Sequence, residues 1–136
     1  MKVVIDTSNL ISALGWQGYS HKIVHMAFER KYELCISLEM LEELNEVAPR
    51  KKFDFSPEEV DEFIEAVLQV ANVVFPETKN TVITEDPDDN KILDCAEAAN
   101  ALFIVSGDKH LLKLKKFKKA EILTAREFWE KVCSKF

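Results

Sequence analysis

The chain alternates between short runs of consecutive apolar residues and longer stretches in which apolar residues recur every three or four positions. The apolar runs predict strands that are covered on both faces, as in the middle of a parallel sheet. We expect such strands at residues 3–5, 33–37, 72–75, 101–106 and 120–123.

The stretches with helical spacing are bounded by residues that start and stop helices. Ser37 and Thr124 are typical N-caps, and Ser56-Pro57-Glu58-Glu59 is a capping box with proline at the first helical position. Ser20 and Asp86 are expected to cap two further helices. The expected helices lie near residues 10–14, 20–30, 38–47, 57–71, 86–100 and 111–114 and after residue 124, and their buried stripes include Leu38, Leu41, Leu44 and Leu68.

Strands that alternate with helices in this way form a parallel sheet with helices on both faces. The sequence therefore predicts an α/β fold with three layers, α/β/α, around a central parallel sheet of about five strands. A length of 136 residues, without repeats or linkers, favours a single domain that covers residues 1–136.

Four acidic residues follow the predicted strands at equivalent places. Asp6 ends the first strand, and Glu43 lies in the helix after the second strand. Asp89 lies in the first turn of the helix after the third strand, and Asp108 follows the fourth strand by two residues. Because the carboxyl ends of parallel strands open on one edge of a sheet, we expect these carboxylates to gather in one crevice.

Each acid also has a purely structural interpretation. Asp6 and Asp108 fit helix N-caps, and Asp89 fits the third position of a capping box. Glu43 fits a solvated helix face, because other glutamates are close by in the sequence. The joint pattern favours a site, because crowded carboxylates repel one another and a cation removes that cost. A site made only of carboxylate oxygens prefers Mg²⁺ or Mn²⁺.

At these residues the chain resembles the PIN domain family, and most closely the small single-domain PIN ribonucleases of toxin–antitoxin pairs. The segments that carry the resemblance are Val3-Val4-Ile5-Asp6-Thr7-Ser8, the stretch from Ser37 to Leu44, Asp89-Asn90-Lys91-Ile92-Leu93 with Ala96, and Val105-Ser106-Gly107-Asp108 with Leu111 and Leu112. Their order and spacing together make the resemblance specific.

The resemblance implies a ligand set for one or two divalent cations. The residues that it assigns to this set are Asp6, Glu43, Asp89 and Asp108, with a hydroxyl group of Thr7 or Ser106 in support. Asp86, Asp88 and Asp94 lie close to Asp89 in the sequence, and the family's spacing to Ile92 favours Asp89 as the ligand.

The activity that the resemblance implies is an endoribonuclease that hydrolyses phosphodiester bonds of single-stranded RNA with Mg²⁺ or Mn²⁺. Such a mechanism needs no histidine, and we interpret His21, His25 and His110 as surface or packing residues because they lack zinc spacing. The candidate contacts to the RNA backbone are Lys109, Lys113, Lys115 and Lys116, with Arg50-Lys51-Lys52 as a second basic patch. A solvated lysine-rich surface is the structural alternative for both patches.

Charge and cysteine content narrow the setting of this activity. The net charge of −6 argues against binding of nucleic acid by bulk attraction, so the attraction must be local or carried by metal ions. Cys35, Cys95 and Cys133 form neither a disulfide framework nor a zinc pattern, which favours a reduced, cytoplasmic location. We expect no membrane span and no signal peptide.

Two other functions stay open at the level of the sequence. One is a PIN-fold module that binds RNA or protein with little catalysis, although an intact set of four acids speaks against it. The other is a haloacid-dehalogenase-like phosphotransferase with Asp6 as nucleophile, but Ser8 stands where such enzymes carry a second aspartate.

The resemblance further implies a homodimer and an antitoxin protein as partner. Candidates for exposed apolar surface are Trp16, Tyr19, Phe28, Phe53 and Phe55.

Overall fold

A six-stranded sheet forms the centre of the protein, which a computed structural model describes over residues 1–136. The strands are β1 (Lys2–Ile5), β2 (Glu33–Ser37), β3 (Asn72–Val74), β4 (Phe103–Val105), β5 (Lys116–Phe117) and β6 (Ala120–Leu123), in the spatial order β3-β2-β1-β4-β6-β5. All neighbours pair in parallel except β5 and β6, which are antiparallel. Because β1 is interior to the sheet, its apolar residues Val3, Val4 and Ile5 are fully buried.

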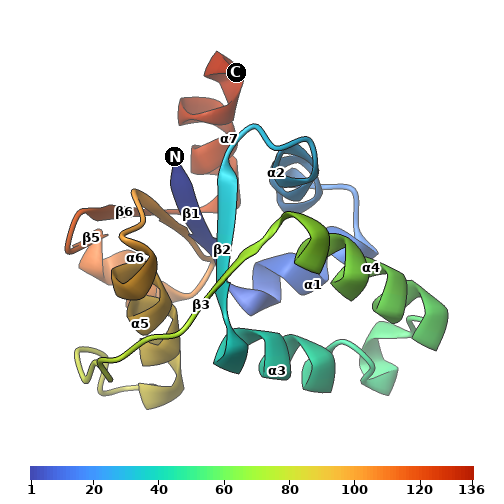
Figure 1. The fold of residues 1–136 in the computed structure, drawn as a ribbon, viewed down its shortest axis with the longest axis horizontal. Helices are drawn as coiled ribbons and strands as arrows, with labels where there is room; N and C mark the ends of the chain where they lie inside the picture. The colour runs from blue at the N-terminus through green and yellow to red at the C-terminus, as the bar shows by residue number, and fades with distance from the viewer.

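Helices cover both faces of this sheet. They are α1 (Thr7–Gly15), α2 (Tyr19–Phe28), α3 (Leu38–Val47), α4 (Pro57–Val70), α5 (Asn90–Ala99), α6 (Lys109–Leu114) and α7 (Ala125–Lys131), with short 3₁₀ turns η1 (Lys51–Phe53), η2 (Pro87–Asp89) and η3 (Cys133–Lys135). In Figure 1, α1, α2 and α4 lie on one side of the sheet and α5 lies on the other. The predicted three-layer α/β/α fold is confirmed. No helix combines the length and the apolar character that a membrane crossing requires.

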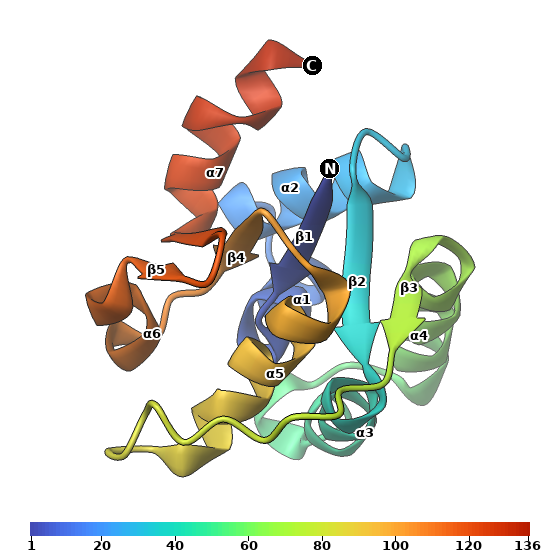
Figure 2. The same ribbon diagram turned by 60° about the vertical axis from the view of Figure 1, so that its left-hand side comes forward.

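The carboxyl ends of the parallel strands share one edge of the sheet. Figure 2 shows β2 and β3 running in the same direction toward α3, while both chain termini lie at the far end of the molecule. The backbone N–H of Asp6 donates to the carbonyl of Val105 at 2.8 Å, and that of Ser106 donates to Leu123 at 3.0 Å. These bonds place the ends of β1, β4 and β6 side by side at this edge.

Several predicted caps are confirmed and two are wrong. The hydroxyls of Ser37, Ser56 and Thr124 accept backbone bonds, and the last two form complete capping boxes. Ser20 instead lies inside α2, which begins at Tyr19 after the N-cap Gly18. Asp86 makes no capping bond, because the chain at Pro87 forms a 3₁₀ turn and the α-helix starts only at Asn90.

The buried faces also differ from the prediction at a few positions. Leu38 is 49% exposed because α3 turns Met40 and Leu44 toward the core, and Leu68 is exposed because α4 buries Val60 and Val67. The sheet contains one strand more than expected. With two residues, β5 is too short to show an alternating pattern in the sequence, so only its pairing with β6 reveals it.

Two leucines on α3 provide a test of this packing. We expect Leu44→Ala to lower the free energy of unfolding by about 2–5 kcal/mol, because Leu44 is fully buried and its removal leaves a cavity. Leu38→Ala on the same helix should change it by less than about 0.5 kcal/mol. Urea unfolding of both variants measures the difference, and equal effects would contradict the assigned buried face.

Candidate metal centre

A cavity of about 590 Å³ lies where the carboxyl ends of the strands meet α1, α3 and α5. All four acids singled out in the sequence line it, namely Asp6, Glu43, Asp89 and Asp108. Each comes from a different element: the end of β1, the middle of α3, the turn η2, and the loop before α6. The fold thus brings together carboxylates that are far apart in the sequence, from Asp6 to Asp108.

Asp6 lies deepest in this group and is 8% exposed. One carboxylate oxygen, Oδ1, accepts the backbone N–H of Ser8 and so caps α1. The other, Oδ2, accepts the hydroxyl of Ser106 at 2.8 Å. Burial raises the pKa of Asp6 above its usual range, and the nearby charges of Glu43 and Asp108 raise it further, against the opposing effect of these hydrogen bonds.

The hydroxyl of Ser106 connects two of the acids. Ser106 is fully buried, and its Oγ donates to Asp6 while it accepts the backbone N–H of Asp108 at 3.0 Å. Asp108 in turn caps α6, because its Oδ1 accepts the N–H groups of His110 and Leu111. Ser106 therefore orients both the carboxylate of Asp6 and the backbone at Asp108, where α6 starts.

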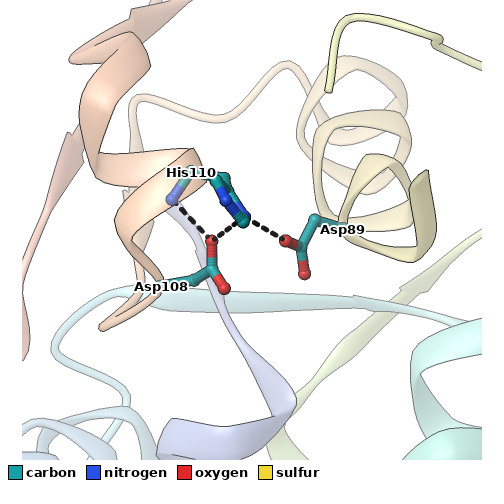
Figure 3. Close-up of side chains that lie close together, drawn as sticks. All are labelled: Asp89, Asp108 and His110. Atoms are coloured by element: carbon teal, nitrogen blue, oxygen red, sulfur yellow. Dashed lines mark hydrogen bonds and ion pairs between the residues drawn. The ribbon is translucent and has the colours of Figure 1, made fainter. Parts of the chain in front are cut away.

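Asp89 and Asp108 line the cavity, and His110 lies beside both of them (Figure 3). The ring nitrogen Nδ1 of His110 lies 3.6 Å from Asp108 Oδ1 and 3.9 Å from Asp89 Oδ2. One possible ligand atom from each of the three residues lies within 4.8 Å of the others. Asp89 Oδ2 and His110 Nδ1 are buried and have no hydrogen-bond partner, so both atoms lack the partner that buried polar groups normally have.

The unpaired Asp89 carboxylate is also electrostatically strained. Burial, together with the charges of Asp108, Asp86 and Asp6, raises its pKa to about 7. A cation among these oxygens would supply the missing partner and offset the repulsion. The donor set, which consists of carboxylate oxygens and one imidazole nitrogen, fits a divalent ion.

Glu43 is held on the other side of the cavity by two donors. Thr7 Oγ1 donates to Glu43 Oε1, and Lys91 Nζ donates to Glu43 Oε2 at 2.6 Å. Lys91 also bonds Asp88 at 2.8 Å, and its side chain is only 12% exposed. Although burial opposes it, these two bonds raise the pKa of Lys91 and keep its ammonium charged. Thr7 thus supports Glu43, because its hydroxyl donates to the carboxylate of Glu43.

The remaining acids near Asp89 have other partners. Asp94 lies outside the cavity lining, and its Oδ1 accepts both the backbone and the side-chain N–H of Asn80. Asp86 and Asp88 both line the cavity; both are exposed, and Asp88 pairs with Lys91. Of these candidates, only Asp89 presents a buried and unpaired oxygen, which supports its choice as the ligand.

The candidate RNA contacts do not line this cavity. Lys109, Lys113, Lys115 and Lys116 are exposed on α6 and the residues that follow it. Two other cations line it instead, Lys91 and Lys52 of the Arg50-Lys51-Lys52 patch.

Asn90 and Lys91 had no role assigned from the sequence, and the interpretation of His110 as a surface or packing residue is wrong, because its ring lies beside Asp89 and Asp108. His110 and Lys91 contact the acids directly, whereas Asn90 holds the segment that carries Asp89. The amide of Asn90 bonds both backbone groups of Ile83 at 2.9 and 2.8 Å and the carbonyl of Pro87 at 3.0 Å. The position of His110 two residues after Asp108, in the first turn of a helix, is a signal from which its proximity could have been predicted.

The comparisons with known proteins point to one family. A family model described as "PIN domain" matches residues 2–110, which include all four acids and His110. A search of the curated proteins finds no match.

Removal of the strained charge should stabilise the metal-free protein. Because the pKa of Asp89 is about 7 in the folded state instead of 3.8, the folded chain holds a proton that the unfolded chain releases. This contribution to stability is complete below pH 3.8 and is lost as the pH rises through 7. We therefore expect Asp89→Asn to raise the melting temperature in EDTA at pH 8 by about 3 °C, with a smaller effect at pH 5.

Thermal unfolding between pH 5 and pH 8 measures this difference. Asp61→Asn, on the exposed face of α4, is the matched control and should change nothing. An Asp89→Asn variant that is no more stable than the wild type at pH 8 would show that the carboxylate is not repelled by its neighbours.

Proposed function

The chain belongs to the PIN domain family, and from this premise we propose that it is a divalent-metal-dependent endoribonuclease that cleaves single-stranded RNA. PIN domains are generally metal-dependent nucleases. One observation carries the proposal in this chain: four carboxylates from separate segments line one cavity, and the most crowded of them has a buried oxygen without a partner. Helix capping accounts for Asp6 and Asp108, and hydrogen bonds from Thr7 and Lys91 account for Glu43, but no such contact accounts for the unpaired oxygen of Asp89.

The proposed cation ligands are Asp6, Asp89 and Asp108, with Glu43 completing the set and His110 adjacent. When bound, a divalent cation supplies positive charge that offsets the charge developing on the phosphate and favours the ionisation of water. Both Mg²⁺ and Mn²⁺ suit the carboxylates, and the imidazole of His110 favours Mn²⁺.

The residues around the ligands hold them in place before substrate arrives. Ser106 fixes Asp6 and the loop of Asp108, and Thr7 and Lys91 fix Glu43. The reaction then needs no nucleophilic side chain: water adds to phosphorus, the bond to the 3′ oxygen breaks, and the leaving oxygen takes up a proton. Asp89 Oδ2 has the spare acceptor capacity to orient the attacking water.

RNA specificity and a toxin role are the finer parts of the proposal. They rest on the resemblance to small PIN ribonucleases, which also suggests a homodimer and an antitoxin partner. The buried, unpaired cysteines Cys35, Cys95 and Cys133 support a cytoplasmic setting. We propose that exposed lysines outside the cavity bind the RNA backbone, namely Lys109, Lys113, Lys115 and Lys116.

Cleavage of labelled single-stranded RNA in Mg²⁺ or Mn²⁺ tests the activity. We expect Asp6→Asn and Asp89→Asn each to lower kcat by about 100-fold or more, because each removes a ligand charge from the cavity. Asp61→Asn should cleave like the wild type. Cleavage that survives both ligand substitutions would place the activity elsewhere, and metal binding without any cleavage would favour the alternative of a PIN-fold binding module.

The metal preference can be tested by direct titration. We expect His110→Ala to weaken Mn²⁺ binding by about 10-fold and to change Mg²⁺ binding much less, because imidazole is a poor ligand for Mg²⁺. Isothermal titration with each ion measures both affinities without substrate. His25→Ala, which removes an exposed histidine paired with Glu29, is the control. Equal losses for the two ions would contradict a direct role of the imidazole.

A further inference from the structure

The cavity that holds the acids has a second wall of a different character. Trp16, Phe53 and Lys52 line it together with the carboxylates. Trp16 is 56% exposed although it is one of the largest apolar side chains in the protein. The cavity of the candidate centre thus contains an exposed tryptophan and a basic residue. These two groups suit a ligand that has both a flat apolar face and negative charge.

Contacts beneath Trp16 hold its ring in place. Phe55 meets it edge to face with ring centres 6.3 Å apart, and Phe53 stacks on Phe55 at 5.7 Å with only 8° between the planes. Gly15 allows this arrangement, because a Cβ atom there would lie 2.8 Å from Phe55 Cζ. The aromatic side chains therefore form a supported surface, and most of Trp16 remains open.

The course of α1 links this surface to the acids. Ser8, Ser12 and Trp16 follow one another at intervals of four residues, and all three line the cavity. At 1.5 Å per residue, Trp16 lies about 12 Å along the helix from Ser8, which is two residues from Asp6. A strand whose phosphate lies at the acids can thus extend past two hydroxyl groups to Trp16.

We propose that Trp16 is a stacking site for an unpaired base of the substrate strand, at a short distance from the phosphate that is cleaved. This inference rests on the proposed nuclease function and names a residue that selects its substrate. Bases stack on aromatic rings with little regard to sequence, because every base has a π-face. In a duplex both faces of a base are covered, so the site favours single strands. Lys52, whose ammonium lies 5.0 Å from the ring centre of Phe53, supplies charge for the adjoining phosphate.

The fold itself has little need of the Trp16 ring. The backbone N–H of Trp16 ends α1 by donating to Ser12, and any residue can make this bond. Removal of a side chain that is more than half exposed leaves the core intact, so Trp16→Ala is expected to fold. The matched control is Phe75→Ala, since Phe75 is 71% exposed and lies outside the acidic cavity.

Fluorescence of Trp16 gives a direct readout of stacking. The chain has two tryptophans, so Trp129→Phe leaves Trp16 as the single reporter. We expect a single-stranded octa-adenylate, without metal ions and at low salt, to quench this fluorescence. An abasic strand of equal length and charge, and a duplex, should leave it unchanged. Quenching by the abasic strand, or none by the octa-adenylate, would overturn the proposal.

Binding and kinetics of the variants separate this proposal from the nuclease proposal. Trp16→Ala should raise the Kd for the octa-adenylate and the KM for cleavage by about 10-fold, leave kcat unchanged, and leave binding of the abasic strand as it is. Trp16→Phe should restore most of the affinity, and Phe75→Ala should have none of these effects. A cleaving Trp16→Ala variant with unchanged KM would overturn the stacking site alone. Quenching of Trp16 without any cleavage by the wild type would overturn the nuclease proposal alone.

Discussion

The repulsion among carboxylates at one edge of the sheet is the constraint that organises this protein. Because β1 and β4 are parallel neighbours, their carboxyl ends lie at the same edge of the sheet. The acids that follow them are close enough to repel one another when both are ionised. Burial adds to the cost, and it raises the pKa of both Asp6 and Asp89. A protein selected only for stability would not collect these groups, so their presence points to a cation and a reaction.

The chain relieves part of this repulsion with its own residues and leaves part of it unrelieved. Glu43 is neutralised by Lys91, and Asp6 is stabilised by the hydroxyl of Ser106. Asp108 accepts two backbone N–H groups, but the only side-chain cation near Asp89 and Asp108 is the imidazole of His110, at distances longer than hydrogen bonds. The acids on one side of the cavity, Asp6 and Glu43, therefore have partners within the protein, whereas Asp89 on the other side has an oxygen free to bind an external ion.

The proposed nucleic-acid binding requires an acidic protein to hold a polyanion. The net charge of −6 opposes long-range attraction of nucleic acid, so binding must depend on local features. In the binding mode that we propose, cations at the acids, Lys52 and the exposed ring of Trp16 would each contact a different part of a nucleotide. Apolar stacking is insensitive to charge, which makes it a suitable source of affinity in a protein of this composition.

The sequence by itself determined the order of the strands and helices, most of the caps, and the four acids as a group. These features follow from local patterns. A β-branched run such as residues 3–5 favours a strand, and the hydroxyls of Ser37 and Thr124 cap helices by bonding backbone groups three residues away. Only the tertiary structure decided which partner each acid has. The bonds of Glu43 to Lys91 and of Ser106 to Asp6 join residues 48 and 100 positions apart, and no local pattern encodes such contacts. The exposure of Leu38 was likewise decided by packing, because exposure depends on which elements meet and not on the residue alone.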